Sequence, residues 1–299
     1  MSTTPFRAMT FLKTVAAGAA VVVSLVAAGT ASAAGAGYAL DHFPTEKLTE
    51  QAALQNGAKL FVNYCLNCHS ASMMRYNRLT DLGLTEKQIK DNLLFSGDKV
   101  GDMMKTALNA KDAKEWFGAL PPDLSVIARA RSSHEGSGSD WLYTYLRAYY
   151  RDSTRPTGWN NAVFPNVGMP HALWELQGSR GVAIEEVKEV KDDKGHAKGF
   201  TKTLITFDAN GARSEATEKI EEHGGAHEGR TVTLGKAEGG KLNQAEYDAN
   251  IADLVAYLTY MADPSAKTRN RIGAWVLMFL ALFGVLAWNL NRVYWKDVK

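Results

Sequence analysis

The chain's two cysteines lie in one short segment, Cys65-Leu66-Asn67-Cys68-His69. Two thiols at this spacing can each add to one vinyl group of the same porphyrin, and the histidine that follows them is placed to bind the iron. The pattern Cys-x-x-Cys-His therefore predicts one covalently attached c-type haem, with His69 as an axial ligand of the iron.

The same segment has two other interpretations, a redox dithiol and half of a zinc site. A zinc site needs a second pair of ligands, but the chain has no other cysteine. His223 and His227 form a His-x3-His pair, yet no cysteine lies near them, so metal binding there is disfavoured. A thioredoxin-type dithiol does not need the histidine and usually lies in a βαβ pattern, which is missing here. We therefore favour the haem.

Residues 1–33 have the three parts of a secretory signal peptide. Arg7 and Lys13 give a positive start, residues 15–28 are apolar, and residues 31–33 form a small-residue cleavage site. An uncleaved anchor is the alternative, but the apolar stretch is too short to span a bilayer comfortably. We expect cleavage after this peptide and a haem domain in the bacterial periplasm.

Residues 272–290 form a second apolar stretch without a charged side chain. With a rise of about 1.5 Å per residue, one helix of this length crosses the hydrocarbon core. A buried core helix is the alternative, but such helices usually have a polar face, and here only Asn289 interrupts the apolar surface. We expect a transmembrane anchor at residues 267–291, in contact with membrane lipid. The signal peptide and the haem then require residues 292–299 to be cytoplasmic.

Residues 34–266 are the expected soluble body, and apolar helical patterns lie near both of its ends. The first pattern precedes the haem segment and contains Leu54, Ala58, Phe61 and Val62. The second pattern contains Ile251, Leu254, Val255 and Leu258 and ends before Pro264. Gly57 could accommodate a close crossing of the two helices. We expect a mainly α, cytochrome c-type haem domain held by this helix pair.

Residues 178–244 have a different character. Apolar alternation at residues 182–184 and 203–207 indicates short strands, and residues 208–211 are a turn signal. Charged and glycine-rich segments surround them. We expect a small β-hairpin insertion with a mobile tip around residues 221–229.

The sixth iron ligand must be chosen among several methionines and histidines. Met73 and Met74 are too near His69, because four residues span at most about 14 Å and must go around the porphyrin edge. Met103 and Met104 are reachable, but helix packing or a surface turn explains them equally well. Met261 is better explained by packing in the core, and Met278 lies in the predicted membrane segment.

Met169 lies in residues 164–171, a loop bracketed by proline and glycine that can hold a thioether rigidly against an iron. His171 is the competitor two residues further on. The choice matters, because a His/His iron has a lower reduction potential than a His/Met iron. The residues alone leave both possibilities open.

Several segments together resemble the cytochrome c1 family, most closely its proteobacterial members. The matching segments are the haem segment, residues 75–79 (Arg-Tyr-Asn-Arg-Leu), residues 118–125 (Gly-Ala-Leu-Pro-Pro-Asp-Leu-Ser), residues 129–131 (Arg-Ala-Arg), residues 164–169 and the C-terminal anchor. The run at residues 118–125 is the specific one. The resemblance covers nearly the whole mature chain apart from the insertion, and the loop at residues 164–169 is shorter than in mitochondrial members.

The resemblance implies roles for further residues. It implies that Met169 is the sixth ligand, that Pro121 and Pro122 wall the haem, and that Arg131 pairs with a haem propionate. A propionate beside an apolar edge is costly unless it meets a cation, and arginine can hold it bidentately. A solvated surface charge is the other interpretation of Arg131, and Arg129 stays unassigned.

The resemblance also implies an electron relay within the cytochrome bc1 complex. The electron would come from the Rieske iron–sulfur protein, reduced by quinol at cytochrome b, and leave to a cytochrome c acceptor. The complex would be dimeric, and no nucleic-acid partner is expected. With two strong axial ligands the iron has no open substrate site, so no catalytic residue is assigned. The alternatives are another membrane-anchored monohaem cytochrome of an oxidase or reductase chain, a haem sensor with an open sixth position, and an assembly subunit.

Overall fold

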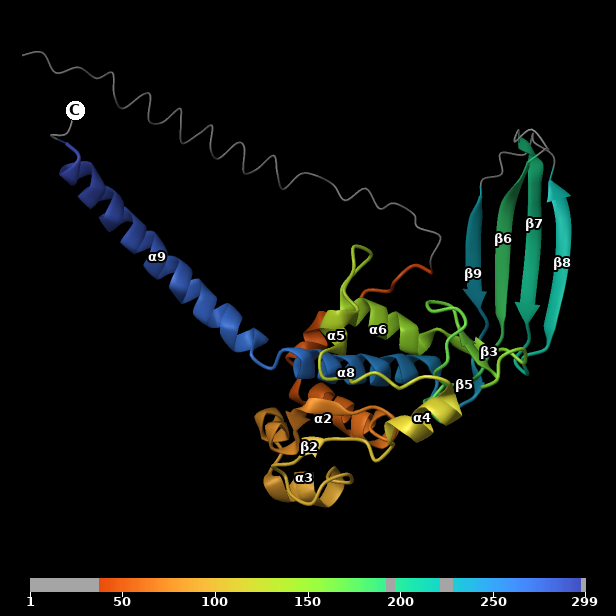
Figure 1. Cartoon of the computed structure of the whole chain (residues 1–299), viewed down its shortest axis with the longest axis horizontal. Coiled ribbons are helices and arrows are strands. Elements are labelled where there is room, and N and C mark those ends of the chain that lie inside the picture. Colours follow the sequence, from red (N-terminus) through yellow and green to blue (C-terminus); the bar gives the residue numbers. More distant parts are fainter. Residues whose placement is uncertain (1–37, 192–196, 221–227, 297–299) are drawn as a thin grey trace, which may run out of the picture. The chain divides into compact units, whose positions relative to one another are not determined.

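A computed structural model of the protein describes residues 38–191, 197–220 and 228–296 (Figure 1). The predicted signal peptide at residues 1–33 lies outside the described residues, as do His223 and His227 in the predicted tip of the insertion.

The described chain is mainly helical, with short strands between the helices and one larger sheet. The helical segments are η1 (Thr45–Leu48), α2 (Gln51–Leu60), the π-helical turn η2 (Phe61–Cys65), η3 (Tyr76–Leu82), α3 (Glu86–Asn92), α4 (Ala110–Phe117), α5 (Ile127–Ala130), α6 (Gly138–Arg147), α7 (Trp174–Gln177), α8 (Gln244–Ala262) and α9 (Ala266–Tyr294). The strands are β1 (Ala71–Arg75), β2 (Met103–Met104), β3 (Tyr149–Arg151), β4 (Trp159–Asn161), β5 (Gly178–Ser179), β6 (Val182–Lys191), β7 (Ala197–Phe207), β8 (Arg213–Ile220), β9 (Gly229–Leu234) and β10 (Glu238–Gly239). The predicted fold class is confirmed.

Helices α2 and α8 cross at Gly57. A Cβ atom on Gly57 would lie 2.0 Å from the backbone oxygen of Asp253 and 2.7 Å from Cβ of Tyr257, so only glycine fits at this position. Beside the crossing, the Asn56 amide donates to the side-chain oxygens of Asn250 at 3.0 Å and Asp253 at 2.9 Å. The apolar stripes of both helices are buried, which confirms the two predicted helices and their contact.

Helix α6 begins at a capping box. The Ser137 hydroxyl accepts from the backbone N–H of Asp140 at 3.1 Å, and the Asp140 carboxylate accepts from the N–H groups of Ser137 at 3.0 Å and Phe43 at 2.7 Å. Burial raises the pKa of Asp140, but the hydrogen bonds outweigh burial and hold this pKa below its usual value. At the other end of α6, Tyr247 of α8 donates to the Leu146 carbonyl at 2.9 Å, which joins the two helices.

Residues 178–244 form more than the small β-hairpin that the sequence predicts. Four strands pair antiparallel in the order β8-β7-β6-β9 (Figure 1). Strands β6 and β7 extend well beyond the predicted stretches at residues 182–184 and 203–207. The prediction was too small because β8 is exposed along almost its whole length. Such a strand lacks the apolar alternation that marks a half-buried one.

A second apolar cluster joins the sheet to β3, and it consists of Tyr150 of β3 with Val182, Ile184 and Phe207 of the sheet. At its base, the Gly235 N–H donates to the Gly181 carbonyl at 2.9 Å. The chain therefore leaves for the sheet and returns from it at one point.

Helix α9 is the one described helix that is long and apolar enough to cross a membrane. The apolar window that qualifies it is not buried at all, unlike the core helix that was the alternative interpretation. The helix runs from Ala266 to Tyr294, so it continues into the predicted tail at residues 292–299.

Candidate haem-binding site

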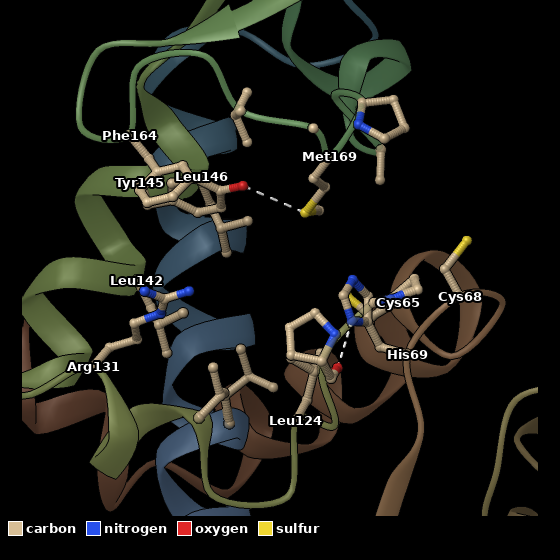
Figure 2. A pocket seen from close by; sticks show the side chains of 18 of the residues that line it. Cys65, Cys68, His69, Leu124, Arg131, Leu142, Tyr145, Leu146, Phe164 and Met169 are labelled. Carbon is tan, nitrogen blue, oxygen red and sulfur yellow. Dashed lines mark hydrogen bonds between the residues drawn. The ribbon is translucent and has the colours of Figure 1, made fainter. Parts of the chain in front are cut away.

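A cavity of ≈ 330 Å³ brings together the residues that the sequence singles out. Cys65, Cys68, His69 and Met169 all line it, and Figure 2 shows the Met169 sulfur pointing toward the space that His69 faces. Its volume is in the range of small-molecule and cofactor sites. Most of the other lining side chains are apolar or aromatic, and Arg131 is the one charged side chain among the described residues that line it.

The haem segment begins at Cys65, the last residue of the π-helical turn η2. The N–H groups of Cys68 and His69 both donate to the Cys65 carbonyl, at 3.1 Å and 2.8 Å, and wind the segment into a tight loop. Burial, with a contribution from Cys68, raises the pKa of the Cys65 thiol to about 12. A redox dithiol depends on a lowered thiol pKa, so this environment does not favour that interpretation.

His69 is oriented by the segment that contains the two prolines. Its Nδ1 lies 2.7 Å from the Pro122 carbonyl, and because a carbonyl only accepts, Nδ1 carries the proton. Burial lowers the pKa of His69, although the bond to Pro122 and the charge of Asp123 oppose this shift. The imidazole is therefore neutral, and its Nε2 has a lone pair for a metal. Both Pro121 and Pro122 line the cavity.

The proline segment is itself fixed by hydrogen bonds. The Asp123 carboxylate accepts from the N–H groups of Ser72 and Ser125, both at 2.8 Å. The Leu124 N–H donates to the Ser70 carbonyl at 2.8 Å. These bonds tie the segment to the residues just after His69, so the carbonyl that orients the imidazole is held in place.

Met169 and His171 have different surroundings. Met169 lines the cavity, whereas His171 is not among its lining residues. The His171 ring is buried and stacks on Tyr149, with ring centroids 4.6 Å apart and an interplanar angle of 5°. Burial lowers the pKa of His171 to about 3, so this ring is a neutral packing group. Of these two candidates, Met169 is the one placed for an iron ligand.

Four other methionines that the sequence analysis considered lie elsewhere. Met103 and Met104 form β2, which pairs with β1, and Met104 accepts a hydrogen bond from the Tyr257 hydroxyl at 3.5 Å. Met73 is 80% exposed, and Met261 is buried in the core.

Two tyrosines that sequence reasoning did not single out lie beside Met169. The Tyr145 hydroxyl is 3.5 Å from the Met169 sulfur and 2.6 Å from the Tyr149 hydroxyl. Burial raises the pKa of both phenols, so both are protonated at neutral pH. The only sequence signal was their i, i+4 spacing at the end of an amphipathic helix, which is ordinarily a sign of core packing.

Arg131 lies at the cavity wall, stacked on aromatic rings. Its guanidinium carbon is 4.4 Å from the centre of the Trp141 ring and 5.9 Å from that of Phe164. None of the carboxylates in the described part of the chain forms an ion pair with it. The side chain is therefore held in position with its charge unpaired by the described protein.

These residues fit a covalently bound haem. The residues that line the cavity carry two thiols, an imidazole and a thioether. The cavity also has apolar walls for the porphyrin faces and a cation for an acidic substituent. This donor set matches a His/Met haem.

Comparison with known proteins agrees with this geometry. The model of the family described as "Cytochrome C1 family" matches residues 42–180. Cytochrome c1 of Allochromatium vinosum is 41% identical over 84% of this chain and 86% of that protein. A protein of Nitrosomonas europaea named ammonia monooxygenase gamma subunit is 37% identical over 92% of this chain and 95% of that protein. The cytochrome b/c1 of Bradyrhizobium diazoefficiens is 23% identical over 83% of this chain and 34% of that longer protein. The chain therefore belongs to the cytochrome c1 family and carries one covalently bound c-type haem.

Proposed function

We propose that this chain is the haem-bearing electron-transfer subunit of a cytochrome bc1 complex. It takes electrons from the Rieske iron–sulfur protein and passes them to a cytochrome c acceptor. The observation that carries the proposal is that His69 and Met169, from distant segments, line one largely apolar cavity beside two thiols (Figure 2). Membership of the cytochrome c1 family supports the same assignment.

The haem, when bound, supplies one-electron oxidation and reduction at its iron. Cys65 and Cys68 would hold the porphyrin covalently. His69 would bind through Nε2, while its Nδ1 keeps its proton and donates a hydrogen bond to the Pro122 carbonyl. Met169 would supply the second protein ligand of the iron. With His69 and Met169 both bound, the iron would have no position left for a substrate, so this chain would relay electrons without a catalytic residue.

The walls of the cavity favour a high reduction potential. Apolar side chains exclude water, and a low-polarity surrounding disfavours the state with the greater charge, which is the oxidised one. Arg131 offsets the charge of a propionate, and its stacking on Trp141 fixes the planar guanidinium that can bind a carboxylate bidentately.

The chain is membrane-anchored, as the exposed apolar helix α9 and the family indicate. We propose that residues 34–266 lie in the periplasm, that the span lies within residues 267–291, and that residues 292–299 are cytoplasmic. We also propose that α9 contacts lipid and cytochrome b within a dimeric complex. A relative whose name combines cytochrome b and c1 supports this neighbour.

A second candidate comes from the relative named ammonia monooxygenase gamma subunit, which matches almost the full length of this chain. In that case the same haem would serve a monooxygenase complex. The two candidates share the haem site and differ in the partner proteins.

Replacing the proposed ligand tests the site. We expect wild-type protein, solubilised in detergent, to be low-spin and to show the near-infrared methionine-to-iron charge-transfer band. Met169→Leu should lose both, because leucine has no donor atom. Met73→Leu is the matched control, since Met73 is largely exposed and outside the cavity, and it should keep both signals. A Met169→Leu protein that keeps the band would assign the ligand to another residue. A high-spin wild type that binds carbon monoxide readily would support a sensor.

Isolation of the intact complex tests the partners. The proposal expects a dihaem cytochrome b and a Rieske protein to co-purify with this chain and quinol to reduce its haem. Co-purification with the other subunits of a monooxygenase instead would favour the second candidate.

A further inference from the structure

We infer that Tyr145, supported by Tyr149, is a positioning residue that fixes the Met169 thioether and raises the reduction potential of the haem. The inference rests on the proposed role of Met169 as axial ligand. It starts from a chain of three polar groups: the Tyr149 hydroxyl, the Tyr145 hydroxyl and the Met169 sulfur. Figure 2 shows the bond from Tyr145 to Met169 at the cavity wall.

The direction of the hydrogen bonds follows from the number of protons. Each phenol has one proton, and the Met169 sulfur can only accept. Tyr145 therefore donates to the sulfur over 3.5 Å, and its oxygen accepts from Tyr149 over 2.6 Å. The Tyr149 hydroxyl also lies 3.4 Å from the Met169 carbonyl, a longer alternative for the same proton. Hydrogen bonds in such a chain polarise and strengthen one another.

Packing leaves neither hydroxyl free to turn to water. Tyr145 is 7% exposed and Tyr149 is 1% exposed. The Tyr145 ring stacks on Trp141 with centroids 4.7 Å apart, and the Tyr149 ring stacks on His171 with centroids 4.6 Å apart. His171 thus has a structural explanation, because it backs the tyrosine that orients the donor to Met169.

The effect on potential follows from the two lone pairs of a thioether sulfur. One is available for the iron, and the Tyr145 hydroxyl engages the other. A hydrogen bond withdraws electron density from the sulfur and makes it a weaker donor. Donation matters more to the electron-poor oxidised state, so its weakening favours the reduced state and raises the potential. The same bond selects which lone pair faces the cavity.

The test compares reduction potentials of the full-length haem-loaded protein in detergent. Tyr145→Phe keeps the ring and its stacking on Trp141 but removes the donor. We expect the equilibrium constant for reduction to fall about fivefold, ~40 mV for a one-electron couple, with the methionine-to-iron band retained but shifted. Tyr149→Phe should cause a smaller fall, about twofold, ~18 mV, because Tyr145 keeps its bond to sulfur.

Tyr143→Phe is the matched control. Tyr143 is on the same helix, contacts Phe43 and Arg147 and does not line the cavity. The reduction potential of the Tyr143→Phe variant should therefore equal that of wild type. If Tyr145→Phe has the wild-type potential and an unshifted band, Tyr145 is only a packing group and the inference is wrong. If wild type has no band, Met169 is not the ligand, and the proposed site and this inference fail together.

Discussion

The α2–α8 crossing and the four-stranded sheet of residues 178–244 stabilise the same chain in opposite ways. At the crossing, backbone and side chains approach so closely that a single Cβ on Gly57 has no room. The sheet instead contributes three buried residues to a small cluster with Tyr150 of β3. It carries charged pairs on its surface, such as Lys202 with Glu185. The stability of the crossing therefore depends on close packing, and the stability of the sheet depends on hydrogen bonds between backbones.

The two regions also differ in how they meet the haem cavity. Leu258 of α8 lines it, and α2 continues through η2 into Cys65, so a displaced crossing should move the residues proposed to hold the haem. No described residue of β6, β7, β8 or β9 lines it. Damage to the crossing should reach the haem, whereas damage to the sheet should stay local.

The largest effect is expected from Gly57→Ala. Helix propensity alone predicts a gain of about 1 kcal/mol, but the new Cβ would lie 2.0 Å from the Asp253 backbone oxygen. Separating the helices should lower the free energy of unfolding by about 3 kcal/mol and reduce the yield of haem-loaded protein. Gly101→Ala is the control, because nothing lies within 4 Å of its added Cβ. Equal stability of the two variants in urea unfolding would contradict the tight crossing.

An intermediate effect is expected from Asp140→Asn, which weakens the start of α6 without touching the sheet. The variant should lose about 1 kcal/mol at pH 7, as is typical for a lost helix cap. The folded pKa of Asp140 is lowered, so its stabilisation is complete above the unfolded pKa, about 3.9, and is lost as pH falls through the lower folded pKa. The difference between wild type and variant should therefore shrink below about pH 4.

Thermal unfolding at several pH values, followed by haem absorbance, measures this difference. Amide exchange of β6 and β7 serves as the internal control, because those strands should be equally protected in both proteins. A stability gap that grows with acidity would have the wrong sign for a lowered carboxyl pKa.

The smallest effect on the haem is expected from removing the sheet. Residues 182–234 can be replaced by Asn-Gly, because Gly181 and Gly235 are already joined by a 2.9 Å hydrogen bond. Exposing Tyr150 should cost about 2 kcal/mol, while the spectrum and the reduction potential should match wild type. Loss of the methionine-to-iron band in this variant would show that the sheet supports the cavity after all.

The sequence predicts those parts of the molecule in which chemistry or periodicity requires particular residues. The spacing of Cys65, Cys68 and His69 follows from the geometry of porphyrin attachment. The stripe from Ile251 to Leu258 reveals α8, and the long uncharged stretch reveals α9, because one-sided and all-round apolar surfaces have different patterns.

Other parts depend on contacts that no local pattern contains. The Pro122 carbonyl faces His69 only because the chain folds back over that loop, and backbone atoms leave no trace in the side-chain sequence. In the sequence, Tyr145 cannot be told apart from other core aromatic residues, because its contact with Met169 exists only in the folded chain. Strand β8 was missed because the strong backbone pairing of a sheet needs no apolar side chains when both faces meet water.

The order of synthesis determines when the α2–α8 crossing can form. Asn56 leaves the ribosome 194 residues ahead of Asn250, its partner across the crossing. At about 5–20 residues per second, the segment with both cysteines exists for on the order of ten seconds before α8 can cover it. During that interval the two thiols are present without α8. The last helix made before α9 is thus the one that adds Leu258 to the cavity wall, so the wall is completed only after the thiols and the imidazole have been made.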